Sequence, residues 1–339
     1  MVNYIWQFTK QLAMFRFLLH VVITLIASSS VGLSQISVVN IAAPTQRNLE
    51  TKTYDSLSNY LSEDIYRYKN QELYLMPKSE NYHKNGFEGF YVDYKVAPQV
   101  NNSNIYKGDG MAVSSYNAIQ GKYFKVLNVH ISQPSARNKY QKEKNSFYLE
   151  LQEKESRDIV YYELNTKFEY GFPFLVTGYF EKQKELLVGK NIIVGGENWN
   201  SKETPMSDIR TGIPVSFERG SKWKCIDLAI DGRYFYLSLI LENENKEQIT
   251  LPMSRFQSPI FRRKAGVYLH SDVLNYTKKF GAENWELIYN NTVKIGFTEE
   301  MVKLSLGEPE KINHSSSGDQ WVYENQYLYF EAGKLKSYN

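Results

Sequence analysis

The feature that most constrains this chain is a pattern of strands that occurs twice. The stretches KYFKVLNV (122–129) and SKWKCIDL (221–228) align residue by residue, so that Phe124 corresponds to Trp223. Each stretch follows a helix pattern and precedes a hairpin of alternating apolar and polar residues. Because alternation with a period of two is typical of antiparallel strands, the repetition predicts two copies of one helix-plus-antiparallel-strand module.

The two hairpins align on their apolar positions. In SFYLELQEKESRDIVYYEL (146–164) the charged EKESRD is expected to form the turn between two strands. Leu149 aligns with Leu237 of the second hairpin, and Leu151 aligns with Leu239. Chance similarity between aromatic-rich strands is the alternative to a duplication.

Each module is expected to begin with a helix, which makes the fold class α+β. In the first copy the apolar residues fall three or four apart on one stripe; they are Tyr54, Leu57, Leu61, Ile65 and Tyr68. In the second copy, residues 178–194 read as a helix that runs into a strand. The predicted modules cover residues 54–170 and 171–258.

The N-terminus is typical of a secretion signal over residues 1–34. Lys10 and Arg16 precede the apolar run FLLHVVITLIA, which is too short to span a bilayer comfortably. Small residues follow, and we expect cleavage between Ser34 and Gln35. An uncleaved membrane anchor is the alternative. Residues 35–53 are polar, show no periodicity and are interpreted as a linker.

Composition limits the classes of function. The only cysteine is Cys225, so the chain has no internal disulfide and no lipid-accepting cysteine beside the signal, and we do not expect a lipoprotein. The net charge of +3 includes Lys10 and Arg16, so it falls to 3 − 2 = +1 without the signal. Nucleic-acid binding needs a concentrated basic face, and we expect none here. The 27 tyrosines favour half-buried strands.

Residues 259–339 are predicted to form a linker and a separate terminal unit. Thr298 is suited to cap a helix that starts at Glu299, because its hydroxyl can accept a hydrogen bond from an exposed amide. Gly307 and Pro309 predict the end of that helix. A helical segment precedes it, and three short alternating segments follow. The expected unit is two helices followed by a three-stranded antiparallel sheet.

This pattern resembles a family of small outer-membrane-assembly lipoproteins, called SmpA/OmlA or BamE. The stretches KIGFTEEMVKLSLGEPEKI and QWVYENQYLYFEAGKL match its helix start, its Leu-Gly-x-Pro helix stop and its aromatic strands over residues 265–339. Phe297 stands where the family usually has methionine. The resemblance implies helices followed by an antiparallel sheet and a place in the cell envelope. It is also similar in architecture to proteinaceous β-lactamase inhibitors, which use that architecture for binding.

The sequence shows no pattern of catalytic or metal-ligating residues, so we expect no catalytic residue, no cofactor and no metal. The four histidines beyond the signal are scattered and lack the spacing of a metal site; they are His83, His130, His270 and His314. Cys225 aligns with Val126 and is interpreted as a small core residue.

The leading hypothesis is an exported, non-enzymatic envelope protein that binds another protein, in the periplasm, at the outer-membrane periphery or outside the cell. We expect no integral membrane segment after cleavage. The candidate interaction surface is the aromatic cluster of the terminal unit, namely Trp321, Tyr323, Tyr327, Tyr329 and Phe330. Two alternatives stay open: a binder of glycan or peptide through an aromatic surface, and a hydrolase whose site is assembled from distant residues.

Overall fold

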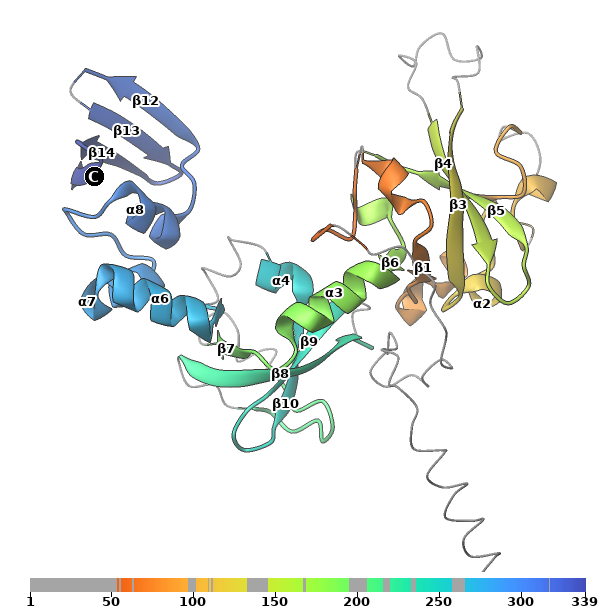
Figure 1. Ribbon diagram of the computed structural model, residues 1–339, viewed down its shortest axis with the longest axis horizontal. Coiled ribbons are helices and arrows are strands. Elements are labelled where there is room, and N and C mark those ends of the chain that lie inside the picture. The colour runs from red at the N-terminus through yellow and green to blue at the C-terminus, as the bar shows by residue number, and fades with distance from the viewer. Residues whose placement is uncertain are drawn as a thin grey trace, which may run out of the picture. The chain divides into compact units, whose positions relative to one another are not determined.

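The computed structural model describes residues 54, 56–62, 64–96, 102–108, 110, 112–132, 146–166, 169–194, 206–215, 220–232, 236–257, 266–316 and 318–339. The predicted signal (1–34), its cleavage point at Ser34–Gln35 and the linker (35–53) lie outside these residues. The described part contains antiparallel sheets and short helices (Figure 1). The α+β prediction is confirmed at this level.

The first sheet has six strands in the order β2-β5-β4-β3-β1-β6, and all neighbouring pairs are antiparallel. The strands are β1 (Glu72–Leu75), β2 (Phe90–Tyr91), β3 (Tyr123–Ser132), β4 (Ser146–Glu153), β5 (Ile159–Leu164) and β6 (Phe174–Val176). The short helices around them are η1 (Ile65–Tyr68), η2 (Glu80–Asn85), η3 (Asn102–Asn104), α2 (Tyr116–Ile119) and η4 (Glu169–Gly171). The predicted hairpin is confirmed by the pairing of β4 with β5.

The second sheet has five strands in the order β10-β9-β8-β7-β11. The strands are β7 (Asn191–Val194), β8 (Ser221–Ile230), β9 (Leu237–Glu242), β10 (Gln248–Pro252) and β11 (Tyr268–Leu269). Helix α3 (Thr177–Leu187) precedes β7, and α4 (Met253–Gln257) follows β10. The order therefore matches β5-β4-β3-β1-β6 of the first sheet.

The two sheets also share an irregularity. The pairing of β3 with β4 shifts after Val126, which lies opposite Leu151. The pairing of β8 with β9 shifts after Cys225, which lies opposite Leu241. Counted from this bulge, Leu151 corresponds to Leu241, so the predicted alignment of Leu151 with Leu239 is wrong by two residues. A shift of two keeps every side chain on the same face, which is why the sequence pattern could not detect it.

The helix predicted over residues 54–68 is wrong. Among the described residues of this range, only the four of η1 are helical, and Leu57 on the predicted stripe is 59% exposed. The side chain of Asn59 instead bonds β6, accepting from the Val176 amide and donating to the Phe174 carbonyl, both at 2.8 Å. Asn and Ser side chains compete with helical hydrogen bonding in this way.

The predicted module boundaries also need correction. The segment after residue 171 was assigned to the second module, but β6 pairs with β1 of the first sheet. Likewise β11 lies after residue 258 and pairs with β7 of the second sheet. Both strands are only two or three residues long and directly precede a helix. Such short apolar runs show no periodicity that reveals their sheet.

The terminal unit begins after β11 and has one helix and one strand more than predicted. Its helices are α6 (His270–Phe280), α7 (Ala282–Tyr289) and α8 (Glu299–Leu306). Its strands pair in chain order as β12 (Lys311–Ser315), β13 (Gly318–Tyr323), β14 (Gln326–Glu331) and β15 (Lys334–Tyr338). Gly281, with a positive φ of 83°, divides the helical segment that was predicted to be continuous. Strand β12 escaped prediction because Ile312 is its only apolar residue.

The predicted start and end of α8 are confirmed. The Thr298 hydroxyl accepts a hydrogen bond from the Met301 amide at 3.3 Å, and Gly307 ends the helix with a φ of 93°. Such capping satisfies amides that the first turn leaves without partners. Figure 1 shows α8 beside the sheet formed by β12, β13 and β14. Met301 and Val302 are buried in the same cluster as Trp321.

Candidate binding surfaces

The structure separates the five predicted surface residues of the terminal unit into two groups. Trp321 and Phe330 are only 1% and 3% exposed, and their ring centroids lie 4.4 Å apart inside the unit. Tyr323 is half-buried and donates its hydroxyl to the Gly307 carbonyl at 2.8 Å. Tyr327 and Tyr329 are 45% and 38% exposed. The prediction is therefore wrong for Trp321 and Phe330, because alternation along β13 and β14 points them into the core.

Tyr327 and Tyr329 lie on the outer face of this sheet, which we call the tail face. A line of side-chain hydrogen bonds crosses three strands there. The Asn313 amide donates to the Gln320 side-chain carbonyl at 2.9 Å, and the Gln320 amide donates to the Tyr329 hydroxyl at 3.1 Å. Cross-strand pairs of this kind hold side chains in one arrangement. The tail face thus presents Tyr329 in a fixed position, beside the exposed Tyr327.

A second group of aromatic residues, which the sequence did not reveal, lies on the outer face of the six-stranded sheet. It comprises the buried Tyr91 and Tyr148 and the half-buried Tyr94, His130 and Tyr161, and we call it the aromatic face. Its members come from β2, β3, β4, β5 and the segment after β2. Alternation along β4 and β5 places Tyr148 and Tyr161 on the face of the sheet that is turned away from the buried leucines. Nothing in the sequence linked these two tyrosines to Tyr94.

The rings of the aromatic face pack against one another. Tyr94 stacks on His130 at 4.6 Å with an interplanar angle of 22°, whereas it meets Tyr161 at 47°. His130 Nε2 lies 2.6 Å from Glu150 Oε2. Burial and the Glu150 carboxylate raise the pKa of Tyr161. The cluster is therefore a tilted group of rings beside carboxylates, and not the row of coplanar rings expected for stacking on sugars.

The aromatic face has no counterpart in the five-stranded sheet. His130 lies opposite Tyr148 in the first sheet, and the residues at the same places in the second sheet are Ala229 and Ser238. Thr250 stands at the place of Tyr161. Two sheets with the same strand order therefore differ in the chemistry of this face.

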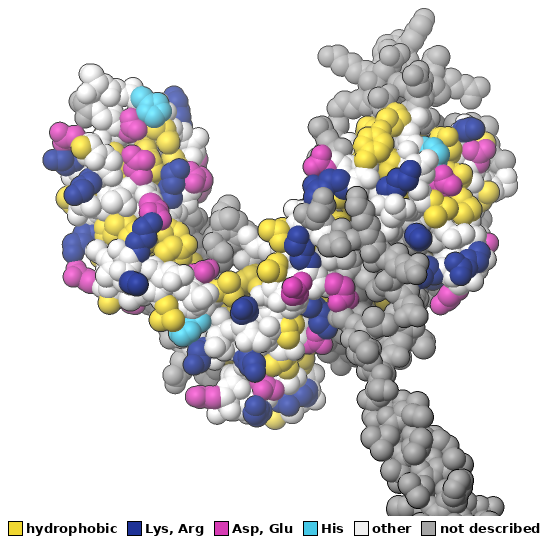
Figure 2. All heavy atoms as spheres, viewed as in Figure 1, with side chains coloured by type: hydrophobic (Ala, Val, Ile, Leu, Met, Phe, Trp, Pro, Cys, Tyr) yellow, Lys and Arg dark blue, Asp and Glu magenta, His cyan; other side chains and the backbone are white. Residues whose placement is uncertain are grey.

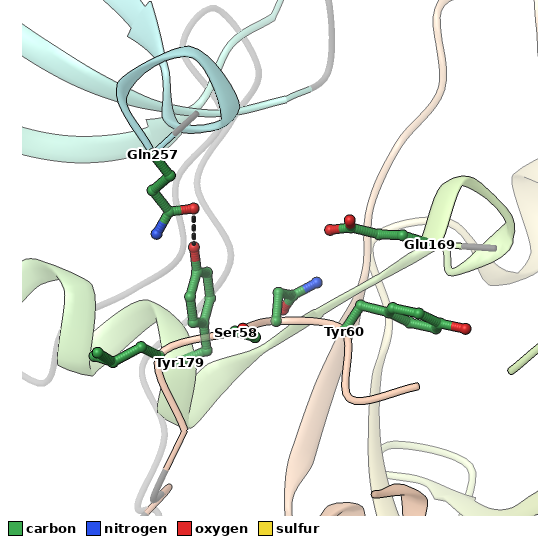
Figure 3. A pocket seen from close by; sticks show the side chains of 7 residues that line it. Ser58, Tyr60, Glu169, Tyr179 and Gln257 are labelled. Atoms are coloured by element: carbon green, nitrogen blue, oxygen red, sulfur yellow. Dashed lines mark hydrogen bonds between the residues drawn. The ribbon is translucent and has the colours of Figure 1, made fainter. Parts of the chain in front are cut away.

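A pocket of about 390 Å³ lies beside the segment that leads into the first sheet. Its lining residues are Leu57, Ser58, Asn59, Tyr60, Glu169, Tyr179 and Gln257. Figure 3 shows the Tyr179 hydroxyl donating to Gln257, at 3.3 Å, with Tyr60 and Glu169 across from them. Burial raises the pKa of Tyr179 to about 12. Among the described residues that line the pocket, Glu169 is the only carboxylate, and they offer no pair of carboxylates for acid–base chemistry.

The buried carboxylate of Glu153 is surrounded by hydrogen-bond donors. It accepts hydrogen bonds from Lys122 Nζ at 3.0 Å, Lys107 Nζ at 3.1 Å and Ser156 Oγ at 2.7 Å. Burial raises its pKa, but these bonds outweigh burial and hold the pKa at about 2. Glu153 ends β4 and Ser156 lies in the β4–β5 turn, so the group stabilises the hairpin.

Cys225 lacks the surroundings of a nucleophile. It is fully buried, and its Sγ lies 3.6 Å from the Asp227 carbonyl. Burial and the Asp227 carboxylate raise the pKa of the thiol to about 12. A reactive cysteine has a lowered pKa and some exposure. Within the described ranges, no group of three or more His, Cys, Asp or Glu residues could hold a metal ion.

The surface charge is mixed. Figure 2 shows Lys and Arg interspersed with Asp and Glu over the described surface in that view. A mixed surface gives no strong field toward an anionic polymer. Across the part of the chain that the structure describes, no helix combines the length and apolar character needed for a membrane span.

Comparison with known proteins gives no match: no family model fits the chain, and neither a curated protein nor a solved structure is significantly similar to it. Its function therefore has to be argued from the tail face, the aromatic face and the pocket.

Proposed function

We propose that this chain is an exported, non-enzymatic protein of the cell envelope that binds another protein through its tail face. The observation that carries the proposal is the pair Tyr327 and Tyr329, which stay exposed on an ordered sheet while Trp321 fills the core on the other side. Tyrosine is enriched in protein interfaces because it offers a large contact area and a hydrogen-bonding group at low entropic cost.

The terminal unit is proposed to be an SmpA/OmlA (BamE)-like domain. The capped α8, its stop at Gly307 and the antiparallel strands that follow support the resemblance. The additional strand β12 and the break at Gly281 are departures from the expected pattern. The proposal extends to fold and compartment, and not to a role in assembling outer-membrane proteins.

The two larger sheets are proposed to derive from one duplicated module. Their common strand order supports this, as does the bulge after Val126 and after Cys225. If the modules are copies, the aromatic face was gained or kept by only one of them. That difference supports a second candidate function, the binding of an extended peptide or a glycan at the aromatic face. The tilt of Tyr94 against Tyr161 favours a peptide over a sugar, whose CH face would stack on rings that lie in one plane.

The test is capture of partners from envelope extract with the purified full-length chain. The wild type should retain a protein that the double variant Tyr327→Ala, Tyr329→Ala loses. Tyr82→Ala is the matched control, because Tyr82 is 59% exposed on η2 and is not part of the tail face. The captured protein is then purified and its affinity for both variants is measured.

Each outcome bears on one proposal. Equal affinity of the wild type and the double variant would show that the tail face is not the contact. Loss of binding on Tyr94→Ala, with the double variant unaffected, would move the function to the aromatic face. Turnover of a substrate by the purified chain would contradict a non-enzymatic role.

A further inference from the structure

The first strand of each sheet in chain order is β1, β7 or β12, and one side of it pairs with β3, β8 or β13. We call the other side its outer edge. In the two larger sheets a short strand pairs with this outer edge. Strand β6 pairs with β1, and β11 pairs with β7, both in antiparallel orientation. Each covering strand directly precedes a helix, namely α3 after β6 and α6 after β11. Strand β12 is likewise the first strand of its sheet, but its only strand partner among the described residues is β13.

In each sheet, the first strand in chain order (β1, β7 or β12) shares a cross-strand pair with its neighbour on the inner side (β3, β8 or β13). An aliphatic residue of the first strand lies opposite a large aromatic residue of that neighbour, which is almost fully buried. The pairs are Leu73 with Phe124, Ile192 with Trp223, and Ile312 with Trp321. The three first strands are therefore equivalent in their packing as well as in their order.

The covering strand completes the burial of this aliphatic residue. Val176 of β6 lies opposite Leu73, and Leu269 of β11 lies opposite Ile192. Leu73 and Ile192 are both 0% exposed. Among the described residues no strand pairs with Ile312 on its outer side, and Ile312 is only partly buried. The aliphatic side chain at this position is therefore fully buried in two sheets and only partly buried in the third.

We propose that the outer edge of β12, along residues 311–314, binds an extended segment of the partner protein as an additional antiparallel strand. This inference rests on the proposed protein-binding function and specifies its mode. Main-chain hydrogen bonds would supply affinity, and a branched aliphatic side chain opposite Ile312 would supply specificity. By analogy with Leu175–Val176 and Tyr268–Leu269, the segment carries a bulky apolar residue just before that aliphatic one.

A second copy of this chain is a poorer occupant. Its β6 and β11 segments have the required sequence, but each already lies in its own sheet. To reach β12 of another copy, either strand would have to leave partners that are fully buried. A separate protein with a free extended segment has no such cost.

The probe is a fluorescein-labelled peptide with the sequence of residues 171–178, GFPFLVTG, titrated into the full-length chain. We expect saturable binding, with hydrogen-exchange protection gained at residues 311–315. Replacing the valine of the peptide by aspartate should weaken binding about tenfold or more, since the aliphatic contact is lost and a charge is placed against the core.

On the protein, Ile312→Ala should lower the affinity for the peptide about tenfold, whereas Lys334→Ala, on the opposite edge strand β15, should leave it unchanged. If Ile312→Ala fails to fold, the aspartate peptide still tests the proposal. Protection at β1 or β7 instead of β12, or no binding, would overturn it. Self-association that protects residues 311–315 without peptide would assign the edge to a second copy and overturn the choice of partner.

The edge and the tail face can be distinguished with the captured partner. If that partner binds Ile312→Ala as tightly as wild type but loses affinity for the Tyr327→Ala, Tyr329→Ala variant, the edge inference is wrong and the proposed function stands. If the partner loses affinity only for Ile312→Ala, the edge is the contact and the tail face is not.

Discussion

Val126 in β3 and Cys225 in β8 occupy the same place in their two sheets. Both are 0% exposed, and the strand pairing shifts immediately after each of them. Each also exchanges backbone hydrogen bonds with the chain that enters the first strand, where Asn70 and Gly189 both have positive φ. A thiol and an isopropyl group thus fill equivalent apolar sites.

This equivalence predicts that Cys225→Val is tolerated. The substitution changes little in volume and removes no strong hydrogen bond, so we expect a loss of less than about 1.5 kcal/mol in the free energy of unfolding. Cys225→Asp is the contrasting variant, because it would bury a carboxylate beside that of Asp227, whose partner Lys184 is already engaged, and it should prevent folding of that sheet. Denaturant unfolding with circular dichroism measures both. A Cys225→Val protein that fails to fold would contradict the equivalence.

Trp321→Ala should destabilise the terminal unit by about 3–5 kcal/mol, as loss of large buried aromatic side chains does. That approaches the whole stability of a small domain, which is about 5 kcal/mol at the low end. Hydrogen exchange of the β13 and β14 amides in the full-length chain is the measurement, and protection there should be lost while β8 stays protected.

Two control variants test whether the stability loss comes from the buried position of Trp321. Tyr327→Ala, on the exposed tail face, should change stability by less than about 0.5 kcal/mol. Trp321→Phe should cost clearly less than Trp321→Ala, because the buried indole Nε1 has no hydrogen-bond partner among the described residues and its loss leaves nothing unsatisfied. Equal effects of Trp321→Ala and Tyr327→Ala would show that Trp321 is not a core residue.

The Glu153 carboxylate should make the first sheet sensitive to acid. Its pKa in the folded protein, about 2, lies below the usual value near 4.5. A lowered folded pKa contributes stability above the unfolded pKa, and that contribution is lost as the pH falls from about 5 toward 2. Glu153→Gln should cost about 1–3 kcal/mol at pH 7 and should flatten this part of the pH profile.

Urea unfolding followed between pH 7 and pH 2.5 gives the comparison. Glu155→Gln is the matched control, because its side chain is 72% exposed and lies 3.8 Å from Lys122. The control should keep the pH dependence of the wild type. Identical profiles for wild type and Glu153→Gln would mean that the buried cluster does not set acid stability.

Export predicts a processed N-terminus. Mass spectrometry of the protein from its native host should find a chain that begins at Gln35, because the apolar run before Ser34 is short and small residues flank the cleavage point. The product should be extracted without detergent. A chain that retains Met1 and partitions into detergent would favour the uncleaved anchor.

Local signals in the sequence were sufficient for several elements. The turn EKESRD and its flanking alternation predicted the β4–β5 hairpin, and Thr298 with Gly307 predicted both ends of α8. These features depend on hydrogen bonds and side-chain periods within a few residues, so the sequence alone carries them. The repeated succession of one strand and a hairpin was visible for the same reason, whereas the order of the strands within each sheet was not predicted.

Only the tertiary structure decided which segments share a sheet. Strands β6 and β11 are too short to show a period, and each joins the sheet that precedes it because its apolar side chains complete the burial of Leu73 and Ile192. The segment from Tyr54 has the apolar spacing of a helix, yet long-range hydrogen bonds from Asn59 to β6 hold the chain before η1 in a non-helical conformation. In the terminal unit, pairing of β13 with β14 turned Trp321 inward and left Tyr329 outside. Burial and strand pairing between distant segments outweigh local preference, and therefore they determined the tail face and the open edge of β12.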